Sequence, residues 1–208
     1  MKGLLCLIAL LLTVLPAIAQ PGVSRPAGIL RIELPPRAYT AAAQPFDPWD
    51  SSLGAVFFNQ LTGSTNAAAA DHIFVWNTVS QTYHCWWKSS NGWVMEGERS
   101  REPSVLPLTI SAGAGFFLQN NQSFTQHVYL AGEILLDAEH ETLLPPAFTL
   151  AGYPYATAIP VLDTALSSVL PASGSPTLPL FLMPGHAFWV FVTNSCVWTE
   201  PCRRNSKN

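Results

Sequence analysis

Charged residues are scarce in this chain of 208 residues. Asp, Glu, Lys and Arg make up 11% of it, less than half of the roughly 25% found in ordinary soluble domains. The 10 Lys and Arg against 13 Asp and Glu form no basic stripe, which excludes recognition of nucleic acid through its phosphates. With 49% hydrophobic residues, the composition also excludes a disordered chain, because disorder needs low hydrophobicity and high net charge.

Several enzyme motifs are absent as well. The chain has no Gly-x-Ser-x-Gly nucleophile turn, no P-loop and no dinucleotide-binding Gly-x-Gly-x-x-Gly. It also has no Cys-x-x-Cys and no histidine pair at ligand spacing, so we expect no metal and no other cofactor. The short groups Asp71-His72 and Glu139-His140-Glu141 would each need ligands from elsewhere to hold a metal.

Residues 1–19 have the features of a signal peptide. Lys2 gives a positive start, residues 4–15 form an apolar run, and residues 17–19 have the small-x-small form that signal peptidase accepts. We expect cleavage before Gln20 and export to the periplasm, the cell surface or the medium. We expect no transmembrane anchor in the mature chain, since an anchor needs about 20 apolar residues.

Three cysteines follow the predicted signal peptide: Cys85, Cys196 and Cys202. An odd number allows at most one internal disulfide, which an exported protein can form. The sequence leaves all three pairings open. We favour Cys196–Cys202, because a turn at Pro201 would bring these two together.

Two parts of the chain share one pattern. Residues 34–46 match residues 144–155 in the order Leu-Pro-Pro, Ala-aromatic-Thr and Pro-aromatic, with Arg37 as a single insertion. A glycine turn and aromatic strand at residues 112–118 match residues 184–190. We therefore predict an internal repeat.

The repeat predicts the domain organisation. Copy one covers residues 20–135, copy two covers residues 136–202, and residues 203–208 form a flexible tail. A copy of about 65 residues is marginal alone, so both copies should form one compact domain. Each copy should contain one short amphipathic helix, starting near Asp50 as N-cap in copy one and near Pro160 in copy two.

Copy one alone contains an aromatic insertion, at about residues 66–105. Residues 73–76, 82–87 and 92–94 read as three strands of a β-meander. The predicted fold class is α+β with mainly antiparallel β, in which two strand–helix–strand units share a core. The alternative is an all-β sandwich or barrel with short helices.

The chain resembles a module of bacterial exported and cell-surface proteins. In that module a Gly-x-Asn-Leu-Ile-Ser-x-Pro strand precedes a helix, an Ile-x-x-Trp/Tyr strand, a Gly-Trp turn and a Pro-Gly-x-Gly-Tyr-Trp strand. The counterparts are residues 38–45, 73–77, 92–93 and 112–117, with a shorter echo at residues 147–154 and 184–189. Neither copy keeps Asn-Leu-Ile-Ser, and copy two lacks the Trp strand. The resemblance implies a secreted or surface protein and carries over no active site.

The insertion contains the strongest candidate for a binding site. Its aromatic residues are Trp76, Tyr83, Trp86, Trp87 and Trp93. Adjacent residues of a strand point to opposite faces, so one of Trp86 and Trp87 should lie in the core and the other outside it. An exposed Trp near Lys88 and Asn91 could stack on a sugar ring. The alternative is cross-strand packing without a ligand.

Carboxylates offer a second candidate. Asp47 and Asp50 flank Trp49, and Glu96 lies two residues before Glu98; paired carboxylates are typical of hydrolases. The alternatives are a turn with a helix N-cap for the Asp pair and a solvated hairpin end for the Glu pair.

These observations favour an exported, non-enzymatic surface or interaction protein. Its partner would be a glycan or another surface protein, bound through the aromatic meander. The alternative is a secreted hydrolase that uses Asp47, Asp50 or Glu96.

Overall fold

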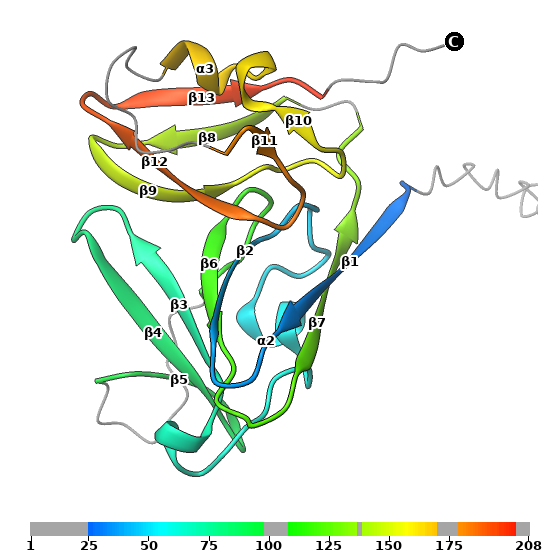
Figure 1. Ribbon diagram of the computed structural model, residues 1–208, viewed down its shortest axis with the longest axis vertical. Helices are drawn as coiled ribbons and strands as arrows, with labels where there is room; N and C mark the ends of the chain where they lie inside the picture. The colour runs from blue at the N-terminus through cyan, green and yellow to red at the C-terminus, as the bar shows by residue number, and fades with distance from the viewer. Residues whose placement is uncertain (1–24, 98–107, 137–138, 170–178, 203–208) are drawn as a thin grey trace, which may run out of the picture.

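The structure is a computed structural model that describes residues 25–97, 108–136, 139–169 and 179–202 (Figure 1). The predicted signal peptide, the predicted tail, the end of the predicted insertion and Glu98 lie outside these ranges. Within these ranges, no helix has the length and apolar character that crossing a membrane requires.

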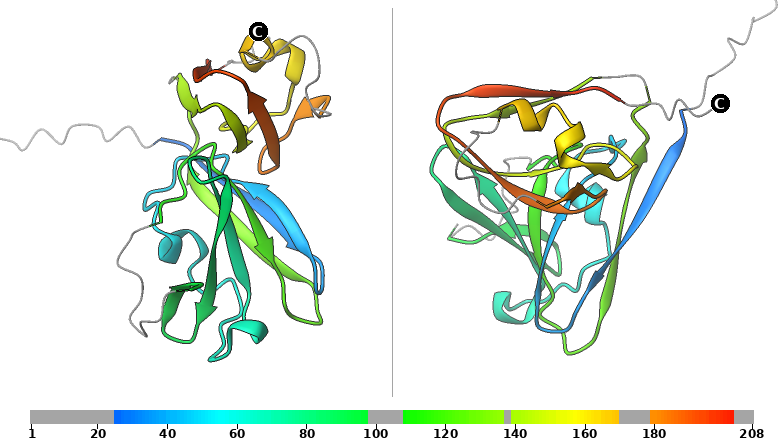
Figure 2. Two further views of the ribbon diagram at one scale, coloured as in Figure 1. Left: turned by 90° about the vertical axis from the view of Figure 1, so that its left-hand side faces the viewer. Right: turned by 45° about the horizontal axis from the view of Figure 1, so that its top comes forward.

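The described chain is mostly antiparallel β and forms two lobes (Figures 1 and 2). Lobe one, residues 25–136, contains a five-stranded sheet in the order β2-β6-β3-β4-β5 and a separate pair of β1 with β7. Its elements are β1 (Ala27–Leu34), β2 (Tyr39–Ala43), α2 (Leu53–Phe57), η1 (Ala67–Ala69), β3 (His72–Asn77), β4 (Thr82–Ser89), β5 (Gly92–Met95), β6 (Gly115–Gln119) and β7 (Gln126–Glu133).

Lobe two, residues 139–202, consists of three two-stranded sheets and short helices. Its pairs are β8 with β13, β9 with β12 and β10 with β11. Its elements are β8 (His140–Leu144), β9 (Ala147–Gly152), β10 (Ile159–Pro160), η2 (Val161–Asp163), α3 (Leu166–Val169), β11 (Phe181–Leu182), β12 (Ala187–Val192) and β13 (Cys196–Glu200).

These pairings confirm the prediction of a mainly antiparallel β protein. The strands do not close into a barrel, so the barrel form of the alternative is wrong. The two α-helices are five and four residues long, and each lies over strands of its own lobe (Figure 1).

Each lobe has its own hydrophobic core. In lobe one, Ile73, Trp86 and Leu118 on one face of the five-stranded sheet pack with residues of α2 and of the β1–β7 pair. In lobe two, Trp198 and Leu166 belong to a second buried cluster. Because side chains alternate along a strand, burial of one face of the five-stranded sheet leaves its other face outside the core.

The N-terminus of α2 differs from the prediction. Ser52, not Asp50, is the N-cap, since its hydroxyl accepts the N–H of Ala55 at 3.3 Å. Asp50 lies two residues before Ser52, and its carboxylate accepts the N–H of Ser52 at 2.8 Å. Both side chains therefore stabilise the N-terminus of the helix, because each accepts a backbone N–H group there.

The two lobes meet at the end of β2. The N–H of Ala43 donates to the carbonyl of Gly185 at 2.9 Å, and the N–H of Gly152 donates to the carbonyl of Gly113 at 2.9 Å. A Cβ atom added to Gly152 would lie 2.0 Å from the Cβ of Ala43. The backbones therefore approach to a distance that only glycine allows at this position.

Candidate functional site: an aromatic face across both lobes

The outer face of the five-stranded sheet is lined with aromatic residues. Phe74 of β3 lies opposite Phe117 of β6, and Trp76 of β3 lies opposite Tyr83 of β4. Tyr39 of β2 joins them, with its ring centroid 5.6 Å from that of Phe74. Since the inner face of the same strands forms the core, alternation directs these rings away from it.

Four of these rings surround a hollow. Tyr39, Phe74, Tyr83 and Phe117 line a volume of about 270 Å³. Tyr39 is 61% exposed and Tyr83 is 42% exposed, so the hollow is open to solvent. Its lining contains no charged side chain and is almost entirely apolar. Partial burial raises the pKa of Tyr83.

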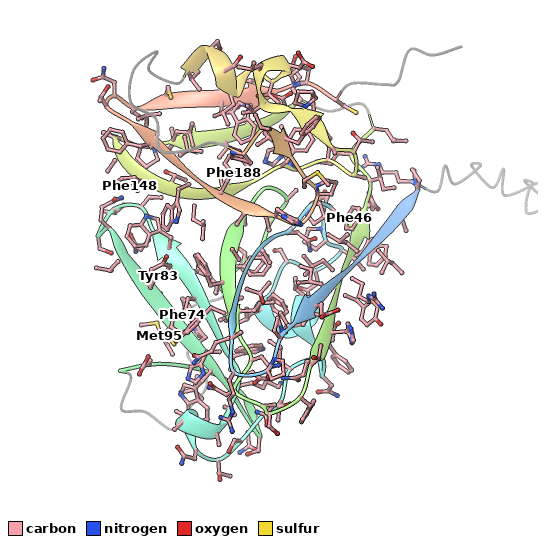
Figure 3. All side chains as sticks on the ribbon, in the orientation of Figure 1. Phe46, Phe74, Tyr83, Met95, Phe148 and Phe188 are labelled. Atoms are coloured by element: carbon pink, nitrogen blue, oxygen red, sulfur yellow. The ribbon has the colours of Figure 1, made fainter. Side chains whose placement is uncertain are left out.

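Rings of lobe two continue this face. Trp189 of β12 lies with its centroid 5.0 Å from Trp76 and 6.4 Å from Tyr83. Phe148 of β9 lies 6.1 Å from Trp189 and 4.9 Å from Phe191. Figure 3 labels Phe148, Tyr83 and Phe74, which follow one another down one side of the molecule. We call this set of rings from both lobes the aromatic face.

Hydrogen bonds fasten the end of the β3–β4 hairpin to β9. The amide of Gln81 donates to the carbonyl of Phe148 and accepts its N–H, both at 3.1 Å. The indole N–H of Trp76 donates to the same carbonyl at 2.9 Å. The side-chain amide of Gln81 thus bonds both backbone groups of Phe148. These hydrogen bonds hold the rings of the two lobes together.

The structure divides the predicted aromatic residues between two faces. Trp76 and Tyr83 belong to the aromatic face, and Trp87 shares their side of the sheet, opposite His72. Trp86 is 6% exposed and lies in the core, so the two adjacent tryptophans point to opposite faces, as predicted. Trp93 packs on the core side, where its ring lies 6.2 Å from Phe57 and 5.7 Å from the ammonium of Lys88.

Sequence reasoning missed one ring within the insertion, Phe74, and all the rings outside it. The latter are Tyr39, Phe117, Phe148, Trp189 and Phe191. The internal match contained a signal for four of them: Tyr39 aligns with Phe148, and Phe117 aligns with Trp189. These aligned positions carry an aromatic residue in both copies, and both lie on the aromatic face.

The candidate carboxylates occupy different places. Asp47 pairs through its backbone with Glu133 at the end of β7, at 3.0 and 2.8 Å. Asp50 holds the start of α2, and its hydrogen bonds from Ser52 lower the pKa of its carboxyl. Glu96 follows β5, the opposite edge of the sheet from β2, and donates its N–H to Cys85 at 2.8 Å. Glu96 therefore follows a different element from the segment that contains Asp47 and Asp50.

Asp71, a buried acid in lobe one, has hydrogen-bond partners within the protein. The carboxylate of Asp71, which is 0% exposed, accepts the N–H groups of Thr62 at 2.7 Å and Asn121 at 2.9 Å and the amide of Gln126 at 2.8 Å. Among the residues that the structure describes, no three His, Cys, Asp or Glu side chains gather into a possible metal site.

The three cysteines that the structure describes are free. Cys196 begins β13 and Cys202 follows its end, so an extended strand separates the predicted Cys196–Cys202 pair and the pair is not formed. The thiol of Cys202 donates to the carbonyl of Leu135 at 3.3 Å. Burial and the neighbouring Glu96 raise the pKa of Cys85 to about 12, which makes that thiol a poor nucleophile.

Comparison of the chain with protein-family models, with curated proteins and with solved structures finds no match. The aromatic face is therefore the feature that indicates a function.

Proposed function

We propose that this protein is an exported, non-enzymatic binding protein that holds a neutral glycan on its aromatic face. The observation that carries this proposal is the solvent-open hollow of about 270 Å³ lined by Tyr39, Phe74, Tyr83 and Phe117. Monomeric proteins seldom expose aromatic rings together unless the surface binds something.

The chemistry of the hollow suits a sugar. A sugar ring has an apolar face of C–H groups that packs on an aromatic ring, and hydroxyls around its edge that need hydrogen-bond partners. The four rings of the hollow supply the aromatic surface for the apolar face of the sugar. The lining has no charge to attract an anionic or cationic ligand, which favours a neutral glycan over a charged one.

Location outside the cell rests on the first residues and on the resemblance. The apolar run and small-x-small site of residues 1–19 are typical of exported proteins, and the module that the chain resembles occurs in exported and cell-surface proteins. Neutral glycans are abundant at that location, so the proposed ligand and the proposed location agree.

We further propose that the two lobes are copies of one ancestral unit. In lobe one β1 pairs with β7 and β2 with β6, and in lobe two β8 pairs with β13 and β9 with β12. Ala41 lies opposite Phe117, and Leu150 lies opposite Trp189. These partners are the residues that the internal sequence match aligns, which supports duplication.

A screen of neutral and charged glycans on an array tests the binding function. We expect the purified protein to bind neutral glycans and Tyr39→Ala to lose most of that binding, because Tyr39 is the most exposed ring of the hollow. Phe181→Ala is the matched control, since Phe181 is 51% exposed on β11.

Two results would contradict the proposal: no neutral glycan is bound, or Tyr39→Ala binds as well as Phe181→Ala. Circular dichroism of each variant will confirm that loss of binding is not loss of folding.

A further inference from the structure

We infer that the outer edge of β1 pairs with β1 of a second copy of this chain, in antiparallel orientation and with Arg31 opposite Glu33 of the second copy. This contact joins the β1–β7 pairs of the two copies into one four-stranded sheet. The surface is separate from the hollow, since no residue of β1 lines the hollow, and its role is independent of the proposed function.

The edge of β7 that faces away from β1 is closed. The N–H and carbonyl of Glu133 bond to the backbone of Asp47 at 2.8 and 3.0 Å. The N–H and carbonyl of Tyr129 bond to the side-chain amide of Gln60 at 2.6 and 3.1 Å. These odd-numbered residues of β7 therefore turn their backbone groups away from β1, and other parts of lobe one pair with them.

The outer edge of β1 has no such partners. Opposite residues of an antiparallel pair turn their backbone groups either toward each other or both away. The N–H of Ile134 donates to the carbonyl of Pro26, opposite it, at 2.8 Å, so the even-numbered residues of β1 bond to β7 and the odd-numbered ones point away. The latter are Ala27, Ile29, Arg31 and Glu33. Among the residues that the structure describes, their backbone groups have no hydrogen-bond partner.

The strand β1 also lacks the features that protect an exposed edge. Natural edge strands are short, bulged, or contain Pro or Lys, which hinder pairing with another chain. In β1, eight residues without Pro or Lys pair with β7 without a bulge. The strand lies along the outer margin of the molecule (Figure 2, right), and its Ile29 is 71% exposed. This edge is therefore suited to accept another strand.

The charges of β1 favour a second copy as that strand. Arg31 and Glu33 are exposed on the same face of β1, because side chains alternate along a strand. Within the described part of the chain, Arg31 has no ion-pair partner, and the carboxylate of Glu33 lies 3.8 Å from Nε2 of His127. Each strand thus offers one positive and one negative charge to its copy.

A two-fold axis at Ile32 pairs these charges. In that register Arg31 of each copy lies opposite Glu33 of the other, because a two-fold axis repeats every contact. Both residues turn their backbone groups outward, so they also exchange N–H···O bonds across the new pair. An axis at Arg31 would place two arginines opposite each other, and like charges there repel. An axis at Leu30 would leave both charges without an opposite charge.

Sedimentation velocity of the purified protein across micromolar concentrations tests the inference. We expect a reversible dimer. Arg31→Glu and Glu33→Arg should each weaken the dimer about tenfold or more, because each places like charges opposite each other at two positions. Both substitutions in one chain exchange the charges and should restore the dimer. Glu141→Arg, which reverses an exposed charge on β8, is the matched control and should dimerise like the unchanged protein.

Two further measurements identify the edge. A mixture of the Arg31→Glu and Glu33→Arg proteins should form a heterodimer, because one strand then has two acidic residues and the other has two basic ones. Hydrogen exchange should show that the backbone N–H groups of Arg31 and Glu33 exchange more slowly in the dimer than in the monomer.

A protein that stays monomeric at every concentration would overturn the inference. A dimer that Arg31→Glu leaves unchanged, or one in which the N–H groups of Arg31 and Glu33 exchange as fast as in the monomer, uses another surface and would also overturn it. Recovery of the dimer in the double variant shows that the single variants are folded. No glycan is present in these measurements, so their outcome is separate from that of the proposed function.

Discussion

Two histidines, one in each lobe, couple folding to protonation. His72 is 9% exposed, stacks on Phe74 at 6.0 Å, and lies with its Nδ1 3.1 Å from the amide of Asn121. His140, at the start of lobe two, lies close to Gly113, where an added Cβ would be 2.9 Å from its Nε2. Burial lowers the pKa of both histidines below the ordinary value of 6.5.

The lowered pKa values predict a loss of stability in mild acid. The unfolded chain takes up protons on these histidines at a higher pH than the folded chain, so protonation favours unfolding. The free energy of unfolding should fall as the pH drops below about 6.5. Urea unfolding at about pH 7 and about pH 5 measures this change.

A double variant tests the assignment. His72→Gln with His140→Gln should unfold with a weaker pH dependence across the same range, whereas His186→Gln, which alters an exposed histidine, should not change it. An unchanged pH dependence in the double variant would show that other groups are responsible.

Among the elements, the β3–β4 hairpin makes a second junction between the lobes, apart from the one at the end of β2. Its turn presents Gln81 to the backbone of Phe148, with two hydrogen bonds of 3.1 Å. Gln81 also has a positive φ of 53°, a conformation that Asn adopts more readily than most residues. The side chain and the turn therefore place separate requirements on this position.

Gln81→Asn separates these two requirements. Asn suits the turn but is one methylene shorter, so it cannot make both hydrogen bonds to Phe148. We expect a loss of about 1–2 kcal/mol in the free energy of unfolding, the worth of two such bonds, measured by urea denaturation. Asn91→Gln, at an exposed turn, is the control. A Gln81→Asn protein as stable as the original would show that the hairpin is not needed to hold the lobes together.

Local sequence patterns predicted these elements with uneven success. The strands of the meander were predictable because residues 73–76, 82–87 and 92–94 are aromatic and apolar segments separated by polar turns. The strands β3, β4 and β5 are found there. The start of α2 was not, because Asp50 and Ser52 both suit an N-cap and only the backbone path decides between them. The partner of Gln81 lies 67 residues away, so no local pattern could reveal it.

At the scale of the whole molecule, the seam between the lobes depends on missing side chains. Gly152 faces Ala43 with no room for a Cβ atom, and Gly185, which has a positive φ of 78°, faces the flexible end of the Leu30 side chain. Such close approach fixes the angle between the lobes and hence the continuity of the aromatic face. The sequence match included both glycines but could not show that they touch the other copy.

Gly152→Ala should therefore destabilise the protein. The new methyl would lie 2.0 Å from the Cβ of Ala43, and overpacking of this kind costs roughly 1–3 kcal/mol. Gly54→Ala is the matched control: nothing lies within 4 Å of its added Cβ, and the change in a helix should be neutral or stabilise by about 0.4–1 kcal/mol. Thermal unfolding of both variants measures the difference. Equal melting temperatures of Gly152→Ala and Gly54→Ala would contradict the close approach of the two lobes at Gly152.

Only part of the candidate site could be predicted from the sequence, because the rest depends on contacts between the lobes. Trp76 and Tyr83 could be predicted because they lie in the aromatic insertion. Phe148 and Trp189 are ordinary strand residues until β9 and β12 are placed beside the β3–β4 hairpin. Contacts between distant segments, which carry most of the site, follow from packing and not from spacing.

One of the described thiols can report the opening of the outer face of the sheet. Cys85 is buried beside Glu96, opposite Phe74 on that face, whereas Cys196 and Cys202 are half-exposed against the core of lobe two. An alkylating reagent should therefore label Cys196 and Cys202 in the folded protein, and Cys85 only when its surroundings on the outer face open. The rate of Cys85 labelling, followed by mass spectrometry, records that opening.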